Sequence, residues 1–186
     1  MSTVTLESPT LRRVITCEAG VGTYTSALVY RPTETDYLAQ AHAEDIRTPE
    51  FDLRVGGRRF TSLSPECANP QVVGTPFMAS VAPLEIVFTL DDPAVRMSLQ
   101  YELDTHHPIL HKQLSVRNLG TQPITLTHVC VEDLPLRDGD TRDWQLYGHY
   151  GTQPRELLYT GRVDDPLVRL RNAKTGATIL ALNGAP

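Results

Sequence analysis

The side chains best able to bind a metal gather around residue 107. His106, His107 and His111 form the densest cluster of ligand-capable residues. A His-x-x-x-His pair holds zinc when a helix places both imidazoles on one face. Pro108, however, favours an extended conformation at His107, and His111 falls within a strand pattern. The sequence therefore predicts structural histidines in and after a turn, and no metal site.

A second group has part of the calcium-loop pattern. Asp138, Asp140 and Asp143 surround Gly139 at spacings that such a loop uses. A calcium loop closes with a bidentate glutamate at its twelfth position. Counted from Asp138, that position holds His149. We therefore expect a solvated Asp-Gly turn here.

Carboxylates are the groups that glycosidic cleavage needs, in pairs about 5–10 Å apart. Glu132 and Asp133 are adjacent, so on a strand they point to opposite faces and cannot flank one bond. Glu85 and Glu102 are further candidates to face solvent. The sequence has no GxSxG, Walker or GxGxxG motif. We therefore assign no catalytic residue and no cofactor.

Aromatic side chains concentrate in Trp144–Tyr150, which contains the only tryptophan. On a strand, Trp144 and Leu146 share one face, and Tyr147 and His149 share the other. Exposed aromatics with polar tips suit the C–H faces and hydroxyls of sugars. Trp144, Tyr147 and His149 are therefore the candidate substrate-binding residues. The alternative is that Trp144 and Leu146 fill the core and the rest is surface.

Short strands must position all these residues. From Val95 to Asp104 apolar and polar residues alternate strictly, which indicates a strand with one buried and one wet face. Two glycines, Gly56-Gly57, suit a primed hairpin turn, and Asn118 with Gly120 predicts a tight turn between Ile109–Arg117 and Ile124–Asp133. Other strands are expected at Leu11–Glu18, Thr23–Tyr30, Phe51–Val55, Arg58–Leu63, Leu84–Leu90, Trp144–Tyr150, Leu167–Arg171 and Thr178–Leu182, with Gln71–Pro83 as a long connection.

Frequent turns and a single short helix candidate, Thr35–Ile46, predict an all-β antiparallel sandwich. The chain has 186 residues, of which 40% are apolar, so we expect residues 1–186 to form one domain with a hydrophobic core. The net charge of −5 argues against nucleic acid or an anionic membrane as partner. The three cysteines are widely spaced, and Cys17 and Cys130 fall in strand patterns, where we expect them to be small buried hydrophobic residues. The sequence has no apolar leader and no apolar run long enough to span a membrane, so we expect a cytoplasmic protein.

The order of residues from Tyr101 to Leu134 is a recognisable one. Tyr101-x-Leu103 is followed by Pro108-Ile109-Leu110-x-Lys112, Leu114-x-Val116-x-Asn118, Ile124-x-Leu126 and Glu132-x-Leu134. This order resembles the N-terminal β-supersandwich of glycoside hydrolase family 36, the α-galactosidase-type enzymes. The resemblance implies a galactose mutarotase-like fold, and a catalytic (β/α)₈ barrel that follows in the same polypeptide.

Three functions stay open. The resemblance favours a non-catalytic sandwich that packs on the barrel, helps shape a pocket for a galactoside, or supports homo-oligomerisation. A stand-alone aldose epimerase is the second, and it would need a histidine and a carboxylate around one sugar ring. Its candidates are His107, His111, His149 and Glu132. The third is a sugar-binding or protein-interaction module without chemistry.

Overall fold

A computed structural model describes residues 1–73, 83–135, 144–150, 153–157, 167–176 and 178–182. Backbone contacts divide the chain into two compact units, Met1–Leu136 and Arg137–Pro186. Each unit is described by itself.

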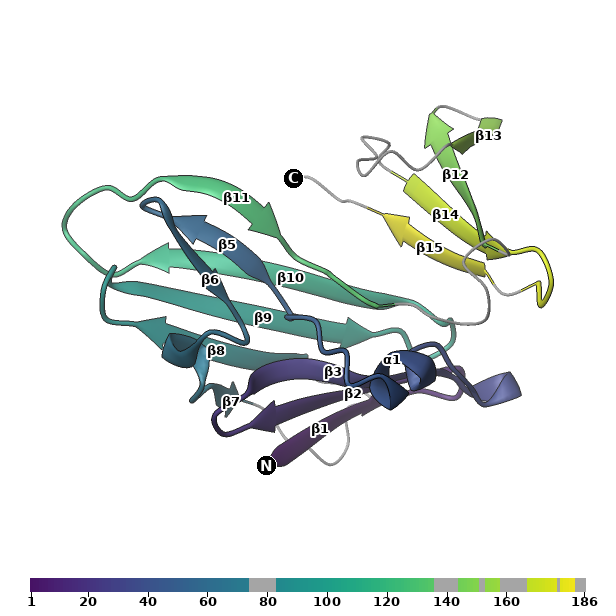
Figure 1. Ribbon diagram of the computed structural model, residues 1–186, viewed down its shortest axis with the longest axis horizontal. Helices are drawn as coiled ribbons and strands as arrows, with labels where there is room; N and C mark the ends of the chain where they lie inside the picture. The colour runs from purple at the N-terminus through teal and green to yellow at the C-terminus, as the bar shows by residue number, and fades with distance from the viewer. Residues whose placement is uncertain (74–82, 136–143, 151–152, 158–166, 177, 183–186) are drawn as a thin grey trace. The chain divides into compact units, whose positions relative to one another are not determined.

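The described residues of the first unit form strands and three short helical segments (Figure 1). Its strands are β1 (Ser2–Glu7), β2 (Leu11–Glu18), β3 (Gly22–Tyr30), β4 (Thr35–Asp36), β5 (Asp52–Val55), β6 (Arg58–Thr61), β7 (Gln71–Val73), β8 (Leu84–Leu90), β9 (Val95–Leu103), β10 (Leu110–Asn118) and β11 (Leu126–Cys130). The helical segments are the 3₁₀ turns η1 (Arg31–Thr33) and η2 (Pro65–Cys67) and the helix α1 (Ala39–Ala43).

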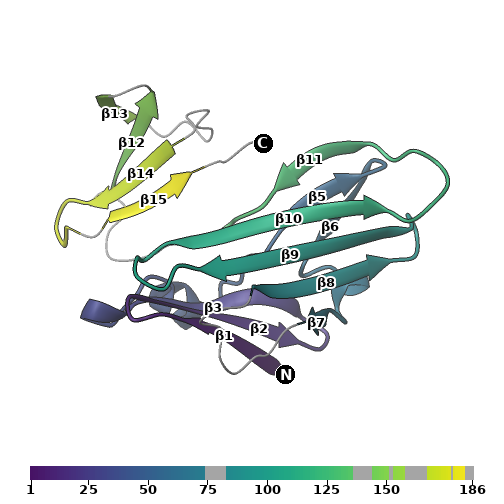
Figure 2. The same cartoon turned by 180° about the vertical axis from the view of Figure 1, so that it is seen from behind.

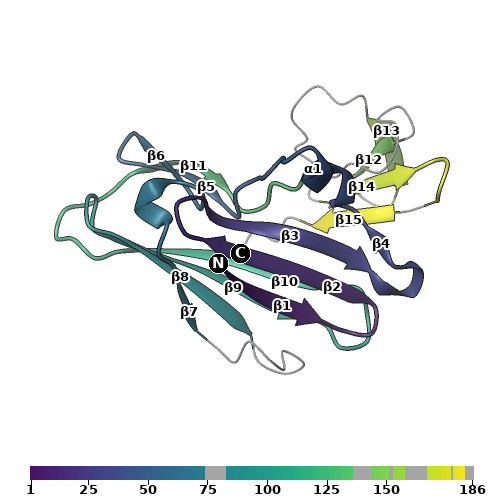
Figure 3. The same cartoon turned by 60° about the horizontal axis from the view of Figure 1, so that its bottom comes forward.

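These strands form three antiparallel sheets with the orders β1-β2-β3-β4, β10-β9-β8-β7 and β11-β5-β6. The first sheet faces the second, as the views from behind and from below show (Figures 2 and 3). The third sheet is joined to the first where Thr23 donates its backbone N–H to the Ser62 carbonyl at 2.9 Å. Ahead of β5, Phe51 packs edge-on against Phe88 of β8, with ring centroids 5.1 Å apart. The all-β antiparallel sandwich predicted from the sequence is thereby confirmed.

The predicted alternation sets the packing of β9. Val95, Met97, Leu99 and Tyr101 are fully buried, whereas Arg96, Gln100 and Glu102 face solvent. In β2 the inward positions hold Leu11, Arg13, Ile15 and Cys17, so a buried arginine interrupts an apolar row. Cys17 is buried as predicted, while Cys130 is only half-buried.

Glycines close two turns of the first unit. Gly56 and Gly57 have φ of 57° and 83° and form the predicted two-residue hairpin between β5 and β6. Gly22, with φ of 117°, begins β3 where the chain passes Ser62 and Leu63; a β-carbon there would lie 2.6 Å from the Leu63 Cα. Only glycine fits this contact between the first and third sheets.

The predicted turn at Asn118 does not make a hairpin. β10 pairs with β9 and β11 pairs with β5, so the connection crosses from one sheet to another. The Asn118 side chain organises the start of this crossing by accepting the Gly120 N–H at 2.9 Å and donating to the Gln122 carbonyl at 2.7 Å. The strand expected over Ile124–Asp133 is also shorter, because β11 ends at Cys130.

The helix expected over Thr35–Ile46 is confined to Ala39–Ala43. Thr35 and Asp36 instead extend the first sheet as β4. The Asp36 carboxylate accepts the N–H groups of Leu28 and Leu38, so it bridges a strand and the turn before the helix rather than capping the helix itself. In the same way, β7 occupies the first three residues of the long connection expected over Gln71–Pro83.

The second unit contains a four-stranded antiparallel sheet with the order β13-β12-β14-β15. Its strands are β12 (Trp144–Tyr150), β13 (Gln153–Leu157), β14 (Leu167–Asn172) and β15 (Thr178–Leu182). Three of them match the predicted strands within one residue, and β13 was not predicted. In the described part of the chain, no helix is long and apolar enough to cross a membrane.

Candidate functional site

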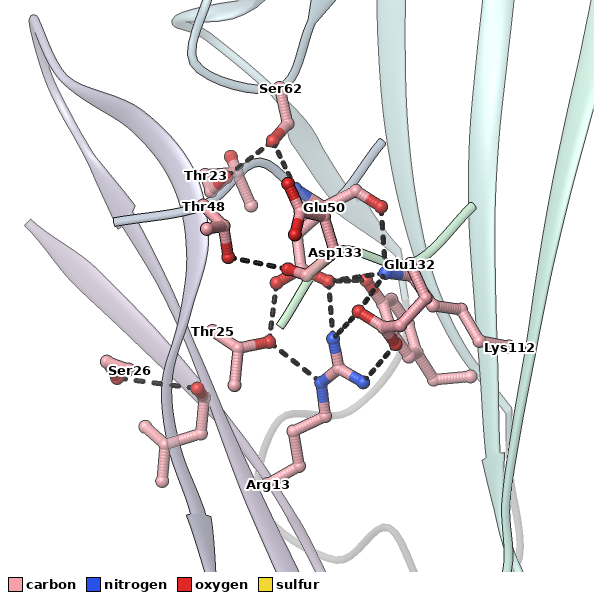
Figure 4. A network of polar contacts seen from close by, with 12 residues as sticks. Arg13, Thr23, Thr25, Ser26, Thr48, Glu50, Ser62, Lys112, Glu132 and Asp133 are labelled. Atoms are coloured by element: carbon pink, nitrogen blue, oxygen red, sulfur yellow. Dashed lines mark hydrogen bonds and ion pairs between the residues drawn. The ribbon is translucent and has the colours of Figure 1, made fainter. Parts of the chain in front are cut away.

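The first unit holds a network of ionised side chains between its facing sheets (Figure 4). At its centre is Arg13 of β2, whose side chain is 1% exposed. The Arg13 guanidinium donates two hydrogen bonds to Glu132, from Nη1 at 2.7 Å and from Nη2 at 3.1 Å. Nη2 also donates to Glu50 at 2.8 Å, and Nε donates to Thr25 at 2.8 Å. Two carboxylates from distant segments therefore bind one buried cation.

Glu50, in the loop before β5, is equally buried. One of its carboxylate oxygens accepts three hydrogen bonds: from Arg13, from the Tyr101 hydroxyl at 2.6 Å and from Lys112 Nζ at 2.9 Å. The other oxygen accepts the Thr25 hydroxyl. Lys112 also donates to the Glu50 carbonyl at 2.7 Å and to Glu132 at 3.1 Å. We call Arg13, Glu50, Lys112 and Glu132 the charge tetrad.

The tetrad carries two positive and two negative charges, and this balance decides the protonation of Glu50. Burial alone would raise the pKa of Glu50, but Arg13 and Lys112, with hydrogen bonds from Thr25 and Tyr101, lower it to about 2. Burial, together with the charge of Glu50, holds the pKa of the Tyr101 hydroxyl well above its ordinary value. At neutral pH Glu50 is therefore an anion and Tyr101 a neutral donor.

Glu132, the carboxylate proposed for an epimerase, lies after β11 and points inward to Arg13 and Lys112. Its side chain is 36% exposed, so it forms the solvent side of the tetrad. His111 occupies the opposite face of β10 from Lys112, because the exposed and half-buried positions alternate along that strand. The structure therefore separates His111 from Glu132 and places it opposite Glu102 of β9 in register.

His106 and His107 lie in the turn between β9 and β10, as predicted. The Asp104 carboxylate accepts the backbone N–H groups of both residues, at 2.8 and 2.7 Å, and its Oδ1 lies 3.1 Å from His107 Nδ1. These backbone hydrogen bonds lower the pKa of the exposed Asp104 carboxyl. His107 is thus held in a local turn, and its described contacts do not include Glu132.

The predicted sugar-binding residues lie in the second unit. Tyr147 of β12 donates its hydroxyl to Gln145 at 2.9 Å, and the guanidinium of Arg169 lies 4.5 Å from its ring centroid. Trp144, also half-buried, occupies the other face of β12, since the two residues are three apart in a regular strand. The structure therefore does not bring Trp144 and Tyr147 to one face. His149 lies within β12, but its side chain, like Asp138, Asp140 and Asp143, lies outside the described residues.

Sequence reasoning missed Arg13 and Glu50 altogether. One signal was present: in the alternating row of β2, Arg13 stands at a position whose neighbours Leu11 and Ile15 are apolar. A charged residue on a buried face requires an ionised partner. The partner itself could not be predicted, because Glu50 and Glu132 lie 37 and 119 residues away along the chain.

Replacing Arg13 tests whether the tetrad holds the sheets together. We expect Arg13→Met to lower the free energy of unfolding by about 3–5 kcal/mol, because it leaves the buried Glu50 carboxylate short of a cation. Arg13→Met with Glu132→Gln should cost less than the sum of the single changes, since both halves of a pair are removed. Arg12→Met, next on the strand and 3.9 Å from the exposed Glu34, should cost under about 1 kcal/mol in urea unfolding. Equal losses for Arg12 and Arg13 would contradict the role given to the tetrad.

The depressed pKa of Glu50 predicts a specific dependence of stability on pH. Its folded pKa of about 2 lies below the ordinary value of 4.5, so ionised Glu50 stabilises the fold above pH 4.5 and this contribution is lost as pH falls toward 2. Urea unfolding of the natural chain between pH 5 and 2 should show this loss. Glu50→Gln should be less stable at pH 7 and flatter over that window. Parallel pH profiles for the two proteins would exclude this linkage.

Comparisons with known proteins give one family match. The model of the glycosyl hydrolase family 36 N-terminal domain matches residues 23–157, more than half of the chain. The matched range includes three members of the tetrad, Glu50, Lys112 and Glu132, and also Tyr101. No curated protein and no solved structure matches the chain. The extent of the family match shows that the chain belongs to the glycosyl hydrolase family 36 N-terminal domain family.

Proposed function

We propose that this chain is a non-catalytic sandwich domain of a glycoside hydrolase similar to α-galactosidases. Hydrolysis would be carried out by a (β/α)₈ barrel in the same polypeptide. The family match, which is to the N-terminal domain of such hydrolases, is the observation that carries the proposal.

The chemistry of the two tetrad carboxylates supports a structural role for them. Glycoside hydrolysis needs one carboxylic acid that donates a proton to the leaving oxygen. Glu50, with a pKa of about 2 and both oxygens occupied, is ionised at neutral pH and has no room for a substrate. Glu132 is bound to Arg13 through both of its oxygens. Neither group is available as a general acid.

Apolar side chains at the sheet edges support packing against another domain. Within the described residues, β10 and β11 end their sheets and pair on one side only. Near these edges Ile109, Leu126 and Val129 are 46%, 42% and 52% exposed. Burying such residues is favourable, at about 25 cal/mol per Å² of apolar surface. We infer that the barrel of the parent protein covers this edge.

A stand-alone epimerase is the alternative with the most specific requirement. Three described histidines lie near a carboxylate: His111 stands opposite Glu102 in register, His107 lies 3.1 Å from Asp104, and His128 lies 3.8 Å from Asp52. All three histidines are exposed to solvent. A sugar there would remain in contact with water, whereas proton transfer to a ring oxygen is promoted by an enclosed site. The arrangement therefore favours the non-catalytic role.

Two assays on the purified chain test this choice. We expect no release of nitrophenol from an aryl α-galactoside and no mutarotation of α-galactose above the buffer rate, measured by polarimetry. Hydrolysis that survives repurification would overturn the proposal, and its loss in Glu132→Gln would assign it to the tetrad. Mutarotation that is lost in Glu102→Gln would instead establish the epimerase.

Sugar contact by the second unit is a further part of the proposal. The Arg169 guanidinium lies 4.5 Å from the Tyr147 ring centroid and both side chains are half-buried, so a ring and a cation are paired at a partly exposed position, which suits a sugar. We propose that Tyr147 contacts a galactoside, with His149 of the same strand as a neighbour and Trp144 as a reporter on the other face.

Titration with galactose tests this contact. We expect a change in Trp144 emission, and about three- to tenfold weaker binding in Tyr147→Ala, because the stacking contribution of one ring is lost. Tyr30→Ala, which replaces a half-buried tyrosine of the first unit, is the matched control. A flat titration by both emission and calorimetry would remove Trp144, Tyr147 and His149 from any sugar site.

A further inference from the structure

The outer face of the third sheet contains a hollow of about 510 Å³. It is lined by Asp52 and Arg54 of β5, Arg59 of β6, and Thr127 and His128 of β11. All five side chains carry hydrogen-bonding groups, and the volume lies within the range of sites for small molecules. The hollow belongs to the first unit and involves no member of the charge tetrad.

Strand register concentrates positive charge in this hollow. Arg54 stands directly opposite Arg59 on one side and His128 on the other. Like charges directly opposite one another destabilise a sheet. One carboxylate compensates the Arg59 guanidinium: Asp52 accepts Arg59 Nε at 3.1 and 3.0 Å and Nη2 at 2.7 Å. His128 Nε2 is 3.8 Å from the same Asp52 carboxylate.

Arg54 is the member of the group that is paired with no described residue. Its guanidinium is exposed and has no hydrogen bond or ion pair with any residue that the structure describes. The hollow therefore has one more guanidinium than carboxylates, in a chain whose net charge is −5. A carboxylate bound at Arg54 would relieve the repulsion across β5 and β6, and the planar guanidinium favours bidentate binding of such a group.

A backbone irregularity lies beside Arg54. The register of β11 against β5 shifts between Leu126 and His128, which leaves Thr127 without a partner position on β5. Bulges of this kind redirect side chains and are common next to binding sites. Thr127 and His128 both line the hollow, so the bulge adds a hydroxyl and an imidazole beside the basic pair.

We propose that this hollow binds an acidic sugar, with the carboxylate of a uronic acid on Arg54. The ligand's hydroxyls would be bound by Thr127, His128 and the Asp52 carboxylate. The lining contains no aliphatic or aromatic hydrocarbon side chain, which argues against an apolar ligand. The choice of a sugar over other carboxylates rests on the proposed function, whereas the anion preference rests on the arginines alone.

The second sheet, β10-β9-β8-β7, supplies an internal control. Arg96 of β9 and Arg117 of β10 are also directly opposed and exposed. They do not line the hollow and have no bulge between them. Substitutions at Arg96 and at Arg54 can therefore be compared. A loss of binding at Arg54 alone would be due to the hollow, and not merely to a pair of neighbouring arginines.

Calorimetric titration of the purified chain with galacturonate, galactose and acetate tests the proposal. Galacturonate should bind at least tenfold more tightly than either of the other two. Arg54→Gln should weaken galacturonate binding about 10- to 100-fold, as expected for the loss of a charge-assisted bidentate contact. Arg96→Gln should leave binding unchanged. Raising the salt concentration should weaken binding by the natural chain, because the site is open to solvent.

Thermal unfolding of each variant shows whether it is folded. If Arg54→Gln does not fold, Arg54→Lys is the second test. Arg54→Lys keeps the charge and loses the planar fork, so it should bind galacturonate with intermediate affinity. Equal binding of acetate and galacturonate would overturn the sugar assignment, and equal losses in the Arg54 and Arg96 variants would overturn the site. Neither result bears on the assays for hydrolysis or on galactose binding at Tyr147, which concern other residues.

Discussion

The structure of the first unit depends on neutralising one buried guanidinium. Arg13 is 1% exposed, and an arginine cannot lose its proton in a protein. Removing such a charge from water costs several kcal/mol unless ionised partners surround it. Those partners are Glu50 before β5 and Glu132 after β11, and Lys112 of β10 balances the second carboxylate. Four separate segments must therefore reach their native positions before the charge is compensated.

This requirement has a consequence for function. A buried carboxylate in a domain of a glycoside hydrolase family could be taken for a catalytic acid or base, since such groups are often buried and have shifted pKa values. The direction of the shift distinguishes the two roles. A general acid needs a raised pKa, whereas the cations and hydroxyls around Glu50 lower it to about 2. The interactions that stabilise the sandwich thus make its most buried carboxylate unsuitable for proton donation.

The fold was predictable to the extent that each strand's own sequence defines it. Strict alternation located β9 and its buried face, and Gly56 with Gly57 located the hairpin between β5 and β6. Alternation does not say which strand pairs with which, and so the crossing after Asn118 from β10 to β11 was predicted as a hairpin. The charge tetrad was missed for the same reason. Its members are joined by tertiary pairing alone. Of the histidines that cluster in the sequence, His106 and His107 are held in a local turn by Asp104, and His111 lies on β10.

Charged side chains are fully paired in the interior of the sandwich, but not on its outer face. Inside, each cation of the tetrad lies within 3.1 Å of both carboxylates, because an unpaired charge there would be strongly destabilising. On the outer face, solvent tolerates an excess of positive charge, and Arg54 keeps a guanidinium without a described partner beside Arg59. Binding requires groups that are not already satisfied. Within the described residues of the first unit, Arg54 on the outer face is such a group, and recognition of a ligand is therefore to be sought there rather than at the charge tetrad.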